Sequence, residues 1–180
     1  MKFCSACGQP VEFRIPEGDT LPRHVCPACG TVHYVNPRIV VGCVPEAGSR
    51  ILLCRRAIDP RYGYWTVPAG FMENGETLAQ GAARETQEEA LAQVEVRDLL
   101  AIVDVTHARQ VHMMFRATLL DGRYGVGHES LEVELFEPRD IPWDLIAFPS
   151  VRFALERFLA DREAGVERLH VTTLARPVAQ

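Results

Sequence analysis

Three glutamates in the middle of the chain have the spacing of a metal-binding stripe. Glu85, Glu88 and Glu89 are three and four residues apart, so on a helix their Cβ atoms lie roughly 5–6 Å from their neighbours on one face. Such like charges repel, and a bridging cation offsets that repulsion. Carboxylates alone suit Mg²⁺ or Mn²⁺, which complete their shells with water and substrate phosphates. A solvated helix face is the alternative interpretation of the same charge run.

A second set of chemically active residues lies near the N-terminus. Two CxxC pairs are separated by 18 residues, and each is followed by a glycine, Gly8 or Gly30. Two short turns that each present a pair of thiolates favour a tetrahedral zinc site, and four sulfur ligands close the shell of a structural ion. Four unliganded thiols are the alternative, while His24 and His33 are assigned surface or packing roles. The predicted zinc ligands are Cys4, Cys7, Cys26 and Cys29.

The glutamate stripe needs a helix to position it, and the sequence marks where that helix begins. Thr77 followed by Gln80 is a capping-box pattern. It predicts a helix from Thr77 to about Ala90, preceded by a strand over 64–68 and a glycine-rich loop. This strand–loop–helix arrangement would present the carboxylates at one end of a sheet.

The remaining pattern predicts a mixture of strands and one further helix. A hairpin is expected over 38–44 and 51–55, with further strands at 94–96, 99–105, 111–119 and 131–135. Cys43 and Cys54 lie inside the hairpin strands as core residues. A helix is expected to follow Pro149 and to stop at Gly165. The last fifteen residues fit either a short strand or a loose tail.

Length and composition limit the classes of protein that this chain can be. Its 180 residues, 47% hydrophobic and 24% charged, suit one main core with a small appendage. The apolar runs are strand-length, and the N-terminus has no apolar signal region, so a soluble cytoplasmic protein without membrane contact is expected. The net charge of -5, with dispersed basic residues, predicts no nucleic-acid partner.

The segment GFMENGETLAQGAARETQEEALA, from Gly70 to Ala92, strongly resembles the Nudix box, and its length excludes the solvated-face interpretation. The resemblance implies a Nudix hydrolase: an α/β (α+β) fold, with an α/β/α sandwich around a mixed sheet, preceded by a small zinc ribbon. The expected organisation is a zinc ribbon over 1–35, a Nudix domain over 36–165 and a C-terminal tail over 166–180. In this family the loop and helix bind divalent ions that activate a water for attack on phosphorus.

By matching position, the resemblance also assigns roles to single residues. Glu85, Glu88 and Glu89 become catalytic Mg²⁺ or Mn²⁺ ligands, the carbonyl near Gly70 becomes a further ligand, and Glu76 and Arg84 support the loop and helix. A later loop supplies another carboxylate, for which Glu132 is favoured over Glu129, and the general base stays open. One position departs from the family pattern, because Leu91 stands where a glycine usually ends the helix. That departure puts the helix exit in question rather than the activity.

Beyond the box, the ribbon joined to NPRIVVGCV and the later GHESLEVELF and IPWDLIAFPS segments resemble zinc-ribbon pyrophosphatases that act on FAD and ADP-ribose. NADH pyrophosphatases are the main rival, but their SQPWPFPxS segment is absent. His107 replaces a proline common in ADP-ribose specialists. The resemblance therefore implies hydrolysis of a dinucleotide diphosphate, with FAD, giving AMP and FMN, or ADP-ribose as the favoured substrate. Tyr62 and Phe71 are the candidates for stacking on the substrate ring.

Two further expectations concern the ribbon. It is expected to stabilise the fold or a dimer interface, so a homodimer is predicted. A non-enzymatic module that senses nucleotides or binds nucleic acid is the alternative from another class. The intact glutamates and the lack of a basic aromatic surface on the ribbon argue against that alternative.

Overall fold

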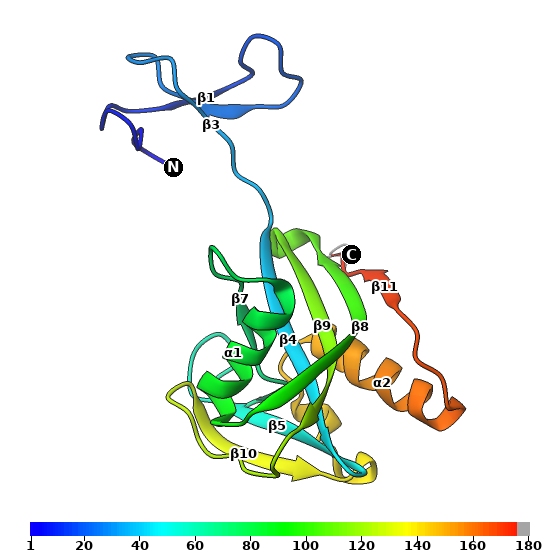
Figure 1. Ribbon diagram of the computed structural model, residues 1–180. Helices are drawn as coiled ribbons and strands as arrows, with labels where there is room; N and C mark the ends of the chain where they lie inside the picture. The colour runs from blue at the N-terminus through cyan, green and yellow to red at the C-terminus, as the bar shows by residue number, and fades with distance from the viewer. Residues whose placement is uncertain (176–180) are drawn as a thin grey trace. The chain divides into compact units, whose positions relative to one another are not determined.

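The computed structural model describes residues 1–175 of the chain. Its internal contacts separate two compact units, with the division after Pro37. Each unit has its own sheet, and the two sheets share no strand. The strands and helices of each unit can be followed in Figure 1.

The N-terminal unit is a small antiparallel sheet with almost no apolar core. Its three strands, in spatial order, are β1 (Glu12–Arg14), β2 (Arg23–Val25) and β3 (Val32–His33). Only Cys4, Pro16, Val25 and Cys26 are buried. So little buried surface cannot offset the entropy lost by ordering the chain, so another interaction must stabilise this unit.

The second unit is built on one large mixed sheet with the strand order β10-β5-β4-β9-β8-β11. β4 pairs with β9 and β8 with β11 in parallel, while the other pairs are antiparallel. Two short strands lie off this path, β6 against β5 and β7 against β4. The strands are β4 (Arg38–Ala47), β5 (Arg50–Arg56), β6 (Trp65–Thr66), β7 (Ala69–Phe71), β8 (Val94–Val105), β9 (Gln110–Leu119), β10 (Ser130–Phe136) and β11 (His170–Thr173).

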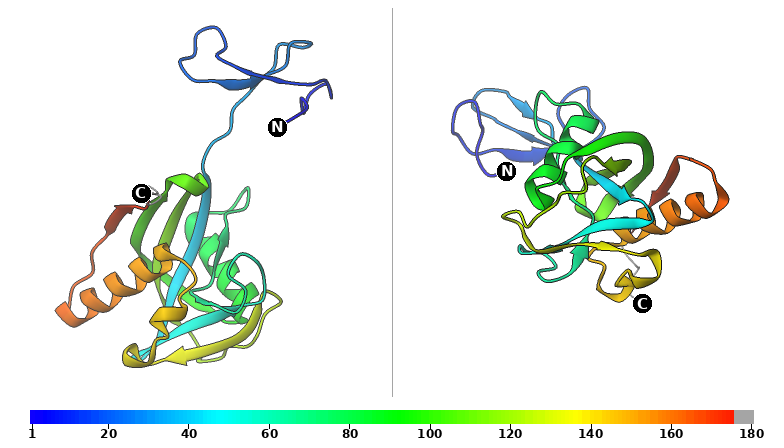
Figure 2. Two further views of the ribbon diagram at one scale, coloured as in Figure 1. Left: turned by 180° about the vertical axis from the view of Figure 1, so that it is seen from behind. Right: turned by 60° about the horizontal axis from the view of Figure 1, so that its bottom comes forward.

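Two helices cover opposite faces of this sheet (Figure 2). On one face α1 (Leu78–Ala90) packs its Ala82 against Val41 and Cys43 of β4. On the other face α2 (Pro149–Ala164) packs Leu155 into a cluster that contains Val44 of the same strand. Side chains on the two faces of one strand thus contribute to two different hydrophobic cores. The expected α/β/α sandwich is confirmed. The short 3₁₀ helices are η1 (Thr106–Ala108), η2 (Pro138–Asp140) and η3 (Trp143–Leu145).

The helix that carries the glutamates starts as its sequence predicts. Thr77 is the N-cap, its hydroxyl accepts from the Gln80 backbone N–H at 3.2 Å, and the Gln80 side chain accepts from the Thr77 N–H at 2.8 Å. Both halves of the capping box are therefore formed. The register of Glu85, Glu88 and Glu89 on α1 is fixed by this start.

The end of α1 resolves the question raised by Leu91. The helix stops at Ala90, and Leu91 adopts the left-handed conformation at φ 47°, which the family glycine would take without strain. The carbonyls of Glu89 and Ala90 accept hydrogen bonds from Gly127 at 3.1 Å and Gly125 at 2.7 Å. The loop before β10 thus satisfies carbonyls that the helix leaves unpaired.

Three elements differ from the sequence prediction. The segments at 94–96 and 99–105 form one strand, β8, because its register against β9 shifts between Val96 and Ala101 instead of breaking. The glycine-rich loop contains β7, a strand too short to show periodicity. The strand expected at 64–68 shrinks to the two residues of β6.

The C-terminal segment forms a strand over the part that is described. β11 adds in parallel to the edge of β8, with His170 opposite Ala101. The remainder of the expected tail, residues 176–180, lies outside the described residues. None of the helices within residues 1–175 combines the length and apolar character needed to cross a bilayer.

Candidate active site and metal centre

Two of the three stripe glutamates are buried where α1 crosses β7. Glu85 is 8% exposed and Glu89 6% exposed, whereas the Glu88 side chain is 59% exposed. The Glu85 carboxylate lies directly against Gly70, where an added Cβ would come within 2.3 Å of its Oε2. The Ala69 N–H donates to Glu89 Oε2 at 3.2 Å. Gly70 is therefore required here, because only a residue without a side chain admits the Glu85 carboxylate against the strand.

The buried carboxylates lie in an environment that disfavours their charge. Burial raises the pKa of Glu89 to about 8, with a further rise from Glu85, although the Ala69 N–H and Arg56 oppose it. Burial also raises the pKa of Glu85, and the neighbouring Arg84 opposes that rise. Two adjacent carboxylates held in this way fit a hard cation, which would supply the positive charge that the protein leaves out.

Arg84 fixes the loop between β7 and α1 to the helix. Its guanidinium donates twice to Glu76, at 2.9 and 3.0 Å, and once to the Phe71 carbonyl at 3.0 Å. It also donates to Glu85 at 2.8 Å and to Glu88 at 3.1 Å. The hydrogen bonds from Arg84 lower the pKa of Glu76 to about 2. These contacts suit the supporting roles predicted for Glu76 and Arg84.

The two candidates for a further carboxylate have different surroundings. Glu132 forms an ion pair with Arg55 at 2.9 Å and faces solvent. Glu129, in the loop that caps α1, is exposed, and its charge contributes to the raised pKa of both Glu85 and Glu89. The charge of Glu129 thus acts on the buried pair, whereas Glu132, which was favoured from the sequence, is paired with Arg55.

Both predicted stacking residues are accessible. Phe71 is the last residue of β7, the strand that contains Gly70. The Arg38 guanidinium lies 4.2 Å from the centroid of the Phe71 ring. Tyr62 lies in the loop between β5 and β6 and is also exposed. Phe71 therefore directly follows Gly70, the residue that the Glu85 carboxylate contacts. Trp65, the aromatic residue of β6, is instead buried in the core.

Arg56, at the end of β5, was not predicted from the sequence as a residue near the site. It is 8% exposed, and its charge acts on Glu89. Strand alternation could have found it, because Leu52 and Cys54 have the same parity and belong to the cluster beneath the C-terminal half of α1. A charged residue that continues an inward-facing row is a signal for a polar site.

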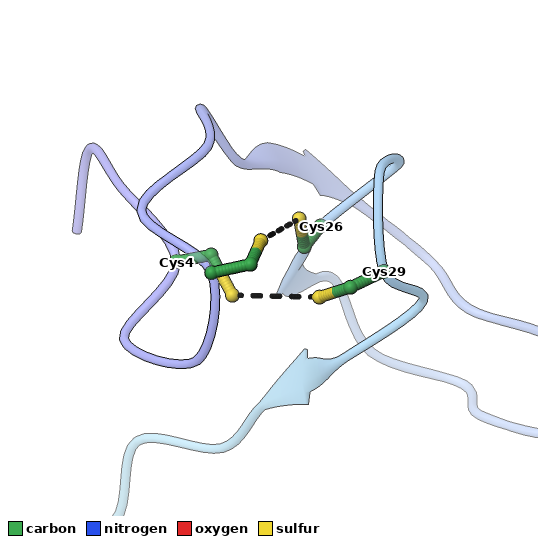
Figure 3. A group of neighbouring side chains, drawn as sticks. Cys4, Cys26 and Cys29 are labelled. Atoms are coloured by element: carbon green, nitrogen blue, oxygen red, sulfur yellow. Dashed lines mark hydrogen bonds between the residues drawn. The ribbon is translucent and has the colours of Figure 1, made fainter.

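The four paired cysteines converge in the N-terminal unit (Figure 3). Their sulfur atoms all lie within 4.8 Å of one another, with Cys4 and Cys29 separated by 3.7 Å and Cys7 and Cys26 by 3.5 Å. Sulfurs at the corners of a tetrahedron around zinc are about 3.8 Å apart, given a Zn–S bond of about 2.3 Å. The spacing therefore fits one ion in a unit that lacks an apolar core.

Side chains outside the cluster contact two of its four sulfurs. His33 Nε2 lies 3.2 Å from the Cys4 sulfur, so this residue contacts the cluster without being needed as a ligand. Hydrogen bonds from Thr31 lower the pKa of Cys29 to about 6. His24 instead packs against the Phe13 ring at 5.0 Å, in agreement with its predicted packing role.

Family models match both units. The Nudix N-terminal zinc-ribbon model matches residues 2–35, and the NUDIX domain model matches residues 36–155, about two thirds of the chain. The chain belongs to the Nudix hydrolase family. The expected family, fold and enzyme class are confirmed at this level.

A solved structure and two curated relatives extend this result. The crystal structure of a NUDIX hydrolase from Nitrosomonas europaea is 55% identical, with a TM-score of 0.94, covering 97% of this chain and 99% of that one. A NAD-capped RNA hydrolase NudC from Stutzerimonas stutzeri is 29% identical over 89% of this chain and 57% of its own length. An ADP-ribose pyrophosphatase from Methanocaldococcus jannaschii is 27% identical over 61% of this chain and 67% of its own.

This Nudix chain thus spans only about three fifths to two thirds of the length of these curated relatives. Their names specify NAD-capped RNA and ADP-ribose, and the second of these is a substrate considered from sequence. Neither name supports FAD.

Proposed function

We propose that this Nudix hydrolase cleaves the diphosphate linkage of an adenine dinucleotide or of ADP-ribose, with divalent metal ions held by Glu85, Glu88 and Glu89. The observation that carries the proposal is the buried pair of carboxylates on β7, with Glu85 packed on Gly70 and Glu89 hydrogen-bonded to the Ala69 N–H. Two carboxylates that are costly to ionise in the free protein are stabilised once a cation and its phosphate ligands arrive.

The residues present suit Mg²⁺ or Mn²⁺, because the available ligands are all oxygens. When bound, such ions lower the pKa of a water and stabilise negative charge on phosphoryl oxygens. The protein's own contribution is to position these groups: Gly70 makes room for the Glu85 carboxylate against β7, and Arg84 ties the loop to α1. Glu129, whose charge reaches both buried glutamates, is proposed as the additional carboxylate, with Glu132 as the alternative.

The choice of substrate rests on the relatives and on one aromatic residue. The two relatives favour a nicotinamide dinucleotide or ADP-ribose over FAD, which the sequence resemblance had placed first. All share an adenosine diphosphate half, and exposed Phe71 beside Gly70 offers a flat apolar surface for its base. We therefore propose that the adenosine diphosphate half is recognised and that the other half varies.

A hydrolysis panel tests this proposal. Purified protein is incubated with Mg²⁺ or Mn²⁺ and with NADH, NAD⁺, ADP-ribose or FAD, and the products are separated by chromatography. The expected result is metal-dependent release of AMP together with the complementary monophosphate. The panel also includes a NAD-capped RNA oligonucleotide. This substrate tests the prediction from the sequence that the protein has no nucleic-acid partner. If EDTA leaves turnover unchanged, the metal-dependent mechanism is wrong.

The N-terminal unit is proposed to bind one structural zinc ion and to support a homodimer. The converging sulfurs and the small core support the first statement. Metal analysis should give one zinc per chain in the wild type and less in Cys26→Ser, with Ser5→Ala as the control. Light scattering on the same samples tests the dimer. A Cys26→Ser protein that retains both zinc and oligomeric state would contradict this role.

A further inference from the structure

The loop of residues 120–129, between β9 and β10, packs on the backbone of α1 at Gly127. This residue is buried, and its N–H donates to the Glu89 carbonyl at 3.1 Å. An added Cβ at Gly127 would lie only 1.9 Å from the Glu88 carbonyl oxygen. Glu129 follows two residues later in the same loop. We propose that Gly127 is a positioning residue that sets the separation between Glu129 and the α1 glutamates, a role that rests on the proposed function.

Gly127 is needed for space rather than for conformational freedom. Its φ lies outside the left-handed region, so an alanine could adopt the same backbone conformation. Cβ atoms are essentially never found closer than 3.0 Å to another heavy atom, and the oxygen met here belongs to the backbone of α1. Because packed backbone transmits strain rather than absorbing it, a methyl group would push the loop about 1 Å away from the helix.

Short backbone contacts connect the position of Gly127 to that of Glu129. Two residues span at most about 7 Å of extended chain. Here the chain turns, because the Ser130 N–H donates to the Gly127 carbonyl at 3.2 Å. On its other side the Glu129 carbonyl accepts from the N–H of Ala57, directly after β5, at 2.8 Å. Glu129 is thus held between α1 and β5, and a shift of the loop at Gly127 moves it relative to the α1 glutamates.

Gly125 provides a comparison within the same loop. Its N–H also donates to a carbonyl at the end of α1, that of Ala90, at 2.7 Å. An added Cβ at Gly125 would lie nearest to the side chain of Leu91, with Cδ1 at 3.2 Å. A leucine side chain can move aside, whereas the helix backbone beside Gly127 cannot. The two glycines therefore make the same kind of hydrogen bond but differ in what an alanine would displace.

The expected role of Gly127 is indirect, because it acts through Glu129 and contacts neither substrate nor metal. Residues that orient a metal ligand contribute about 10–100-fold to metal affinity or to activity. A misplacement of about 1 Å in a reacting arrangement can lower the rate by about 100-fold. Loss of the close contact at Gly127 should therefore weaken metal binding and lower kcat.

The first test measures Mn²⁺ binding without substrate, by electron paramagnetic resonance, in wild type, Gly127→Ala, Gly125→Ala and Glu129→Gln. We expect Gly127→Ala and Glu129→Gln to bind Mn²⁺ about 10-fold or more weakly than wild type, because both lose a correctly placed carboxylate. Gly125→Ala is the matched control and should stay close to wild type. Equal Mn²⁺ affinities in Gly127→Ala and Gly125→Ala would overturn the proposal.

This binding measurement separates the role of Gly127 from the proposed function. If the wild type hydrolyses none of the substrates in the panel, the proposed function fails, and the Mn²⁺ affinities still test Gly127. If the wild type is active and the Mn²⁺ affinities are equal, the proposed function stands and the role of Gly127 is refuted.

A double-mutant cycle distinguishes positioning of Glu129 from a general effect on the end of α1. With ADP-ribose at saturating Mg²⁺, Gly127→Ala should lower kcat by about 100-fold in the wild-type background. In a Glu129→Gln background the same substitution should change kcat little, because the carboxylate that it displaces is already absent. Additive losses in the two backgrounds would mean that Gly127 does not act through Glu129, and they overturn the proposal.

Insertion of one glycine directly after Gly127 tests the same role if Gly127→Ala does not fold. The insertion keeps Gly127 against α1 and displaces Glu129 by one residue, and an exposed loop tolerates such a change at little cost in stability. We expect this variant to melt close to the wild-type temperature while its Mn²⁺ affinity and kcat fall as in Gly127→Ala. A folded insertion variant with wild-type Mn²⁺ affinity and kcat would show that the spacing from Gly127 to Glu129 is unimportant, and the proposal would fail.

Discussion

The two helices of the Nudix unit carry buried charged residues that differ in how fully their charges are paired. On α1, Glu85 and Glu89 are buried together, and the nearby arginines do not neutralise them fully. On α2, Asp161 is buried with Arg116, accepts from the Arg168 N–H at 3.2 Å, and contacts His170 at 3.0 Å. The first cluster has excess negative charge, and the second is satisfied within the protein.

This difference distinguishes a site that can bind a ligand from a cluster that only stabilises the fold. The satisfied cluster joins α2 and β9 to the segment that leads into β11, because Arg116 also donates to the Arg168 carbonyl at 2.9 Å. A cavity of about 350 Å³ is lined by Asp161 and Arg116 together with Arg97, Arg162 and two glutamates. Its charges are mutually paired, for example Arg97 with Glu46 at 3.2 Å. Such a cavity calls for no ligand, whereas unpaired buried carboxylates do.

The largest expected effect comes from removing the charge of Glu89, one of the two buried carboxylates on α1. Glu89→Gln should lower kcat by about 1,000-fold, because a ligand for the activating cation is lost. Initial rates over a Mg²⁺ titration measure this effect. Glu156→Gln, an exposed glutamate that pairs with Arg152 on α2 at 2.9 Å, is the control and should keep wild-type rates. Undiminished hydrolysis in Glu89→Gln would remove Glu89 from the site.

Breaking the paired cluster around Asp161 should have a different effect. The protein should lose stability, while each folded molecule keeps its activity. Asp161→Asn leaves the Arg116 charge buried without its partner, which costs about 3–5 kcal/mol. For a chain of this size the melting temperature should fall by roughly 6–20 °C. Asp140→Asn, in an exposed pair with Arg139 at 3.7 Å, is the control and should change stability little. A stable Asp161→Asn variant with low kcat would instead assign the α2 cluster to function.

How well the sequence predicts each cluster depends on how far apart its residues lie in the sequence. The α1 stripe was predictable because its members lie within one turn and share a capped helix, and the role of Arg84 was implied by the resemblance to the Nudix box. Arg56 and Glu129 reach the site through strand pairing and a loop, which no local pattern records. The α2 cluster joins residues 45 and 52 positions apart in sequence, so only the tertiary fold brings Arg116 to Asp161. The sandwich was predictable from the Nudix box, whereas β7 was too short to show periodicity.

The two clusters should also respond to pH in opposite directions in metal-free protein. Glu89 has a pKa raised to about 8 in the folded state, so its contribution to stability is full below its ordinary pKa of about 4.5 and is lost as pH rises toward 8. Burial opposes ionisation of Asp161, but His170, the Arg168 N–H and Arg116 together lower its pKa. Its contribution is present above its ordinary pKa of about 3.8 and is lost as pH falls below that value.

Urea unfolding in EDTA at a series of pH values measures both responses. Glu89→Gln should be more stable than wild type at pH 7, by about 3 kcal/mol for a pKa shift of this size, and the difference should vanish near pH 4. Added Mg²⁺ should narrow the gap by stabilising the wild type. A Glu89→Gln protein that is less stable than wild type in EDTA would show that the charge of Glu89 stabilises the free enzyme.

The smallest expected effect concerns the ends of the same two helices. α2 ends at Gly165, with φ 65° and no atom within 4 Å of where a Cβ would lie, while α1 ends at Leu91 in the same left-handed conformation. Because that conformation costs a residue with a Cβ about 1 kcal/mol, Gly165→Ala should destabilise by about that amount and Leu91→Gly should stabilise by up to that amount. Urea unfolding of both variants and of the double variant checks this, and near-cancellation is expected in the double variant since the sites are independent. If Leu91→Gly destabilises, the contact of Leu91 with Gly125 in the loop that carries Glu129 outweighs the strain. In that case the leucine holds this loop against α1, and kcat should fall together with stability.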